Sequence, residues 1–65
     1  MSDYEQFAKA VLKELAAQIT ARTDSVSAGD CKTFDEYQRL TGEIRGLTVA
    51  HGEIQALLEK AREHE

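Results

Sequence analysis

The chain has 65 residues, of which 42% are hydrophobic and 31% charged, and its formal net charge is −4 at pH 7. This composition is typical of a single helical domain, here spanning residues 1–65, and it is too apolar for a disordered chain. The negative charge and the scattered Lys and Arg residues disfavour nucleic-acid binding, because phosphate contacts require clustered positive charge. No apolar run approaches the ~18 residues that a membrane-spanning helix needs.

A first helix is predicted over about residues 3–27. Ser2 and Glu5 have the spacing of a capping box, in which the serine hydroxyl accepts a hydrogen bond from the backbone N–H of Glu5 and the glutamate carboxylate reaches back. Apolar residues then recur at helical spacing and predict one face that packs on a partner. That face comprises Tyr4, Ala8, Val11, Leu15, Ile19 and Val26, widened by Phe7 and Leu12.

Gly29 is expected to end the first helix, because glycine is the usual residue at the left-handed position after a helix. Thr33 and Glu36 then form a second capping box, which opens a second helix over about residues 33–63. Its apolar residues alternate at spacings of three and four, as in a coiled coil: Tyr37, Leu40, Ile44, Leu47, His51, Ile54, Leu58 and Ala61. Two helices joined by a short turn predict an all-α fold, an antiparallel two-helix hairpin.

Antiparallel pairing about this turn predicts a register in which paired residue numbers total about 60. Val26 would then meet Phe34. The expected hairpin core comprises Val11, Leu15, Ile19, Leu40, Ile44, Leu47 and Ile54. Arg22 falls on the same face, and we expect its stem to lie along the interface while its guanidinium reaches an acid such as Asp24 or Asp35. A phosphate-binding role for this arginine is the alternative.

A hairpin of this length has a marginal core. Small chains bury a low fraction of their surface, and an elongated hairpin buries less than a compact fold. Cys31 is the single cysteine, so no internal disulfide can compensate. We expect Cys31 to be an unpaired thiol, with a symmetric intermolecular disulfide as the alternative. The hairpin is therefore expected to be completed by oligomerisation or by docking on a larger protein.

Two glycines inside the second helix need an explanation. Gly42 and Gly46 point away from the first helix, and each costs about 0.5–1 kcal/mol relative to alanine. They are either tolerated surface residues or a means of flattening the outer surface so that a partner can approach closely. We favour the second interpretation. The protein-binding face that it predicts comprises Gly42, Arg45, Gly46, Val49 and Glu53.

No set of residues predicts a catalytic, cofactor-binding or metal site. His51 faces the first helix among aliphatic residues, where a neutral ring with a hydrogen-bonded nitrogen is expected. His64 lies about 20 Å further along a straight helix, and Cys31 lies at the opposite end, so the three cannot share a metal ion. Enzymatic activity is not expected.

The residues Tyr37, Leu40, Gly42, Ile44, Gly46 and Leu47 form the pattern Tyr-x-x-Leu-x-Gly-x-Ile-x-Gly-Leu. This pattern, and the turn Ala28-Gly29-Asp30-Cys31-Lys32 before it, resemble small helical proteins of tailed bacteriophages. The resemblance covers about residues 25–60. It implies a minor virion or morphogenesis component without enzyme activity or cofactor. The implied partners are capsid, portal or connector subunits. The protein itself would occur in multiple copies in the virion, and in the host cytoplasm during assembly.

Three functions remain open at this point. The first is a structural protein that docks on, or oligomerises within, a phage particle. The second is a small phage-encoded regulator that inhibits a host protein by inserting a helix into a groove. The third is a helical nucleic-acid-binding module, which the sign of the net charge disfavours.

Overall fold

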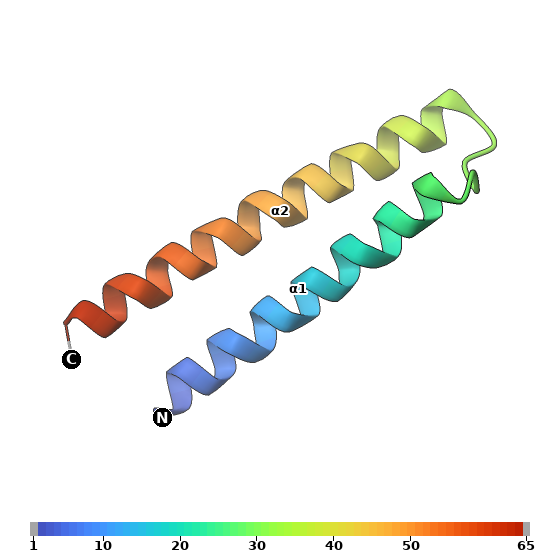
Figure 1. Cartoon of the computed structure of the whole chain (residues 1–65). Coiled ribbons are helices and arrows are strands. Elements are labelled where there is room, and N and C mark those ends of the chain that lie inside the picture. The colour runs from blue at the N-terminus through green and yellow to red at the C-terminus, as the bar shows by residue number, and fades with distance from the viewer. Residues whose placement is uncertain (1, 65) are drawn as a thin grey trace.

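The computed structural model describes residues 2–64, and these form two antiparallel helices joined by a short turn (Figure 1). Helix α1 spans Asp3–Ser27 and helix α2 spans Phe34–Glu63. No strand occurs in this described part of the chain, so the predicted all-α hairpin is confirmed. The molecule is a rod with principal extents of 49 × 15 × 12 Å.

Backbone hydrogen bonds at the turn explain where α1 ends. Gly29 has a φ of 77°, as expected for the left-handed position. Its N–H donates to the carbonyl of Val26 at 3.2 Å, and the N–H of Asp30 donates to the carbonyl of Ser25 at 3.0 Å. This pair of bonds is the Schellman arrangement, which satisfies carbonyls that the helix leaves without partners. The chain can therefore reverse direction at Gly29.

The two predicted capping boxes have different outcomes. Thr33 accepts a hydrogen bond from the backbone N–H of Glu36 at 3.1 Å, as predicted. The Glu36 carboxylate accepts a hydrogen bond from the backbone N–H of Lys32 at 2.9 Å. In a capping box the donor would be the N–H of the next residue, Thr33. Ser2 makes no side-chain cap on α1, because its hydroxyl instead lies 3.5 Å from the Glu5 carboxylate as a donor. The start of α2 is the better capped of the two helix starts.

Two ion pairs between the helices define their register. Arg22 Nε lies 2.8 Å from Glu43 Oε1, and Arg62 Nε lies 3.5 Å from Glu5 Oε2. The residue numbers of these pairs total 65 and 67, so the expected total of about 60 is wrong. Between the Arg22–Glu43 pair and the turn, α1 has five residues and α2 has nine. The first turn of α2 therefore reaches past the end of α1 (Figure 1).

This overhang leaves two aromatic residues of α2 uncovered. Phe34 is 69% exposed and Tyr37 is 44% exposed. Their rings stack on each other, with centroids 6.3 Å apart. The expectations that Phe34 meets Val26 and that Tyr37 begins the inner stripe were wrong, because α1 ends before it reaches their level.

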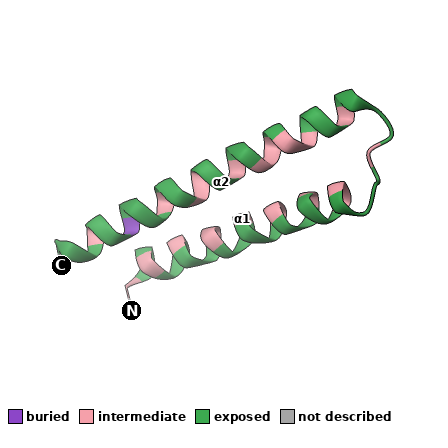
Figure 2. Ribbon diagram, turned by 45° about the horizontal axis from the view of Figure 1, so that its top comes forward, coloured by how far each residue is buried: buried purple, intermediate pink, exposed green. Residues whose placement is uncertain are grey.

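Burial along the helix interface is shallow. Leu58, at 7% exposure, is the only buried side chain among residues 2–64. Figure 2 shows half-buried residues along the sides on which the two helices face each other. The predicted core residues are half-buried: Val11, Leu15, Ile19, Leu40, Ile44, Leu47 and Ile54. Two helices cover each other on one side only, so most facing side chains keep some contact with water.

The apolar face of α1 is narrower than the sequence indicated. Phe7, expected to widen it, is 72% exposed. Tyr4, also expected on this face, is 41% exposed, and Leu57, at the same end of the hairpin, is 64% exposed. Phe7 and Leu57 lie on the flanks of their helices, and the contact between two helices covers only the centre of each apolar stripe. Tyr4 lies on the stripe itself, in the first turn of α1.

Candidate interaction surfaces

The five residues predicted to bind a partner lie exposed on α2, on the side away from α1. This outer glycine face comprises Gly42, Arg45, Gly46, Val49 and Glu53, of which Val49 is 56% exposed. A side-chain carbon added at Gly42 or Gly46 would meet nothing within 4 Å. Packing within the hairpin therefore does not require glycine at either position, although each glycine weakens the helix by about 0.5–1 kcal/mol.

Shallow hollows mark this face and its flank. One, of about 330 Å³, is lined by Gln38, Thr41, Gly42 and Arg45. Another, of about 250 Å³, is lined by Glu53, Ala56, Leu57 and Lys60. The first hollow lies where Gly42 has no side chain, so a partner could approach the helix backbone closely there.

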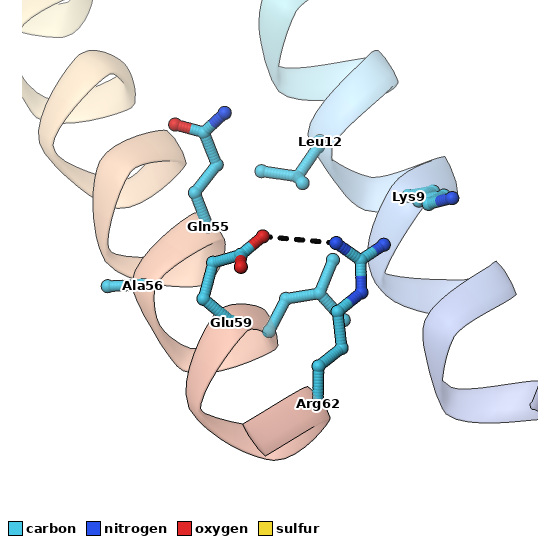
Figure 3. A pocket seen from close by; sticks show the side chains of 7 residues that line it. Lys9, Leu12, Gln55, Ala56, Glu59 and Arg62 are labelled. Carbon is cyan, nitrogen blue, oxygen red and sulfur yellow. Dashed lines mark hydrogen bonds and ion pairs between the residues drawn. The ribbon is translucent and has the colours of Figure 1, made fainter.

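A larger groove lies between the helices near the chain ends (Figure 3). This terminal groove has a volume of about 490 Å³ and is lined by Lys9, Leu12, Gln55, Ala56, Leu58, Glu59 and Arg62. The Arg62 guanidinium donates to Glu59 at 3.0 Å and lies 3.5 Å from Glu5, whose side chain is only 14% exposed. Leucines from both helices and this ionic rim give the groove a mixed apolar and charged lining. No motif in the sequence indicated the groove, because its residues come together only in the observed register.

Arg22 binds Glu43 and not the expected Asp24 or Asp35. Its Nε donates to one carboxylate oxygen of Glu43 at 2.8 Å, and Arg39 Nη1 donates to the other at 2.9 Å. The hydrogen bond from Arg22, followed by that from Arg39, lowers the pKa of Glu43 below its usual value of 4.5. The shifted register explains the change of partner, because it brings Glu43 to the level of Arg22.

This cluster predicts that part of the fold's stability is lost in acid. The pKa of Glu43 is lower in the folded chain, so its carboxylate stabilises the fold above about pH 4.5, and this contribution disappears as the pH falls through the lowered pKa. We expect Glu43→Gln to be less stable than the wild type at neutral pH, and we expect this difference to be smaller at about pH 3. Urea unfolding followed by circular dichroism at both pH values would measure the difference.

The matched control for this prediction is Glu53→Gln, which neutralises an exposed carboxylate on the same helix. Its effect on the free energy of unfolding should be small at both pH values. If Glu43→Gln destabilised the chain equally at neutral pH and at about pH 3, the ion cluster would not be the cause.

The remaining chemically reactive residues lie apart from one another. His51 is half-buried on the inner side of α2, and Cys31 is a half-buried free thiol in the turn. Within residues 2–64, no group of His, Cys, Asp or Glu side chains is arranged to hold a metal ion. Neither described helix combines the length and apolar character that crossing a membrane requires.

No family model, curated protein or solved structure matches this chain.

Proposed function

We propose that this chain is a non-enzymatic interaction protein that binds a larger protein assembly by helix packing. The observation that carries the proposal is the incomplete core: Leu58 is the only buried side chain among residues 2–64. The apolar stripes on both helices are half-buried, and several large apolar side chains are 41–72% exposed. Burying this surface against another protein is the most direct way to stabilise such a rod.

The proposed binding surface is the outer glycine face. Gly42 and Gly46 leave the α2 backbone open, so that a partner helix can pack at the short end of the usual 8–10 Å interaxial range, ~8 Å. Val49 supplies apolar contact at the centre of the face, and Arg45 and Glu53 supply charged groups at its rim. An apolar centre with a polar rim is the usual composition of a protein–protein interface.

The assembly that we propose is a tailed-phage particle, with capsid, portal or connector subunits as the partners. This assignment is supported by the resemblance of Tyr37–Leu47 to small helical phage proteins. A rod with one small binding face suits an assembly of symmetric repeats, because the same interface can be used around a ring. The chain would then occur in multiple copies in the virion and in the host cytoplasm during assembly.

A second candidate is a small regulator that inhibits a host protein by helix-in-groove binding. Val49 and Leu57 are 56% and 64% exposed on α2, and Ala56 lies between them at the i+7 position. Apolar residues at such spacings are the anchors by which a helix binds a groove.

Mass spectrometry of purified particles distinguishes the two candidates. A structural component should be present at a fixed ratio to the capsid or portal protein. A regulator should be absent from particles and should instead be recovered with one host protein from infected cells. Absence from both fractions would contradict both candidates.

Substitution of one glycine tests the proposed surface. Gly46→Leu should reduce incorporation into particles at least about tenfold, because the leucine side chain would hold the partner helix away from the backbone. Helicity should be retained, since a side chain at this position meets nothing in the hairpin. Incorporation is measured by mass spectrometry and helicity by circular dichroism.

The matched control is Gly52→Leu. Gly52 is equally open to solvent, but it is six residues from Gly46 and therefore about 120° away around the helix. This variant should be incorporated normally. Normal incorporation of Gly46→Leu would show that the glycines are merely tolerated.

A further inference from the structure

We propose that two copies of this chain form an antiparallel dimer, in which the Phe34–Tyr37 ring pair of each copy occupies the terminal groove of the other. The dimer surface is separate from the outer glycine face, and the proposal holds whether or not that face binds a particle. Four observations support the dimer. They are the positions of the ring pair and the terminal groove, the chemistry of these two features, the uncharged side of the hairpin that lies between them, and the total exposed area of the chain.

The ring pair and the terminal groove lie on the same side of α2. Tyr37 precedes Gln55 by 18 residues, which is about five complete helical turns. Phe34 precedes Glu59 by 25 residues, which is about seven complete turns. Along the helix axis, Tyr37 and Gln55 are about 27 Å apart. A two-fold antiparallel dimer would therefore bring each ring pair to the groove of the other copy, as a self-complementary interface requires.

The chemistry of the two features is complementary. Phe34 and Tyr37 are 69% and 44% exposed, and their rings stack on each other. Leucines from both helices line the groove and would bury the ring faces. Lys9 and Arg62 at the rim of the groove could interact with the ring faces as cations (Figure 3).

The side of the hairpin between groove and ring pair carries no Asp, Glu, Lys or Arg. On α1 this uncharged strip comprises Leu12, Ala16, Ile19, Thr23 and Val26. On α2 it comprises Thr41, Ile44, Thr48, His51 and Gln55. Spacings of three and four residues keep each set on one side of its helix. A two-fold axis near Thr48 would bring the strips of two copies together without burying an unpaired charge.

The exposed area matches what a dimer requires. The accessible surface of the chain is 4,880 Å², whereas a compact protein of the same mass exposes roughly 4,100 Å². The excess of about 800 Å² follows from the elongated shape of the rod, and it is similar in size to the area that each partner buries in a standard stable interface. A second copy on this side would surround the half-buried stripes with four helices, as in a four-helix bundle.

Sedimentation equilibrium of three proteins tests the dimer. The wild type should dimerise with a dissociation constant below about 100 µM. Tyr37→Ala should raise that constant about thirtyfold, the effect expected when an aromatic anchor is removed. Phe7→Ala removes a more exposed ring, at 72% exposure, that does not line the groove and lies about 140° around α1 from Leu12. This variant should leave the constant unchanged. A monomeric wild type, or equal weakening by Phe7→Ala and Tyr37→Ala, would overturn the proposal.

A cross-link tests the antiparallel arrangement. In a Cys31→Ser background, Thr48→Cys places one thiol per chain next to the proposed two-fold axis, and a short bismaleimide should join two chains. Val49→Cys is the control, because Val49 lies on the outer glycine face and should not be cross-linked. Cross-linking at Val49 but not at Thr48 would overturn the arrangement. Gly46→Leu should leave the dimer intact, so a result against the particle-binding proposal can be distinguished from a result against the dimer.

Discussion

Leu58→Ala should lower the free energy of unfolding by about 2–3 kcal/mol, whereas Leu57→Ala should change it by less than about 0.5 kcal/mol. The two leucines are adjacent on the same helix, and both variants remove the same atoms. Leu58 is 7% exposed and Leu57 is 64% exposed, so the difference between the variants reports burial alone. We expect the lower part of the known range for leucine truncation, because the shallow interface lets water reach the space that is vacated.

Thermal unfolding followed by circular dichroism, at matched protein concentrations, measures this difference. For a chain of this size, 1 kcal/mol corresponds to about 4–8 °C, so Leu58→Ala should lower Tm by roughly 10–20 °C. Matched concentrations are necessary because association also raises Tm. Equal effects of the two variants would mean that Leu58 is not the best-buried residue of the hairpin.

Alanine substitution of two glycines should change stability in opposite directions. Gly29 has a φ of 77°, a conformation that costs an alanine about 1–2 kcal/mol, so Gly29→Ala should destabilise the hairpin. Gly52 lies inside α2 with nothing near a side-chain carbon, so Gly52→Ala should stabilise it by about 0.5–1 kcal/mol. The two variants should therefore differ by about 2 kcal/mol in the free energy of unfolding.

Urea unfolding of both variants and of Gly29→Asn completes this test. Asparagine tolerates the left-handed conformation better than alanine, so Gly29→Asn should lie between Gly29→Ala and the wild type. A Gly29→Ala variant that is more stable than the wild type would contradict the left-handed turn.

The helices and the turn could be predicted because their signals are local. Gly29 requires a left-handed conformation wherever the chain lies, and Thr33 caps α2 through an amide three residues away. The outward position of Gly42 and Gly46 follows from the same helical periodicity that places the leucines inside. Predicting these features requires no knowledge of how the two helices pack against each other.

The register could not be predicted, because the apolar pattern is nearly unchanged by sliding one helix. Both stripes repeat about every seven residues, so a slip of one heptad again places apolar residues opposite each other. The expected total of about 60 differs from the observed totals of 65 and 67 by about one heptad. The ion pairs of Arg22 with Glu43 and of Glu5 with Arg62 form in the observed register. The terminal groove depends on that register, so the sequence alone did not reveal the groove.

The length of the rod affects how this protein will behave in solution. A particle 49 Å long and only 15 by 12 Å across experiences more friction than a sphere of the same volume. Even a single copy should leave a gel-filtration column ahead of globular standards of 7.2 kDa. An early elution volume would therefore imitate association, and only a shape-independent determination of molar mass, such as light scattering, can count the copies.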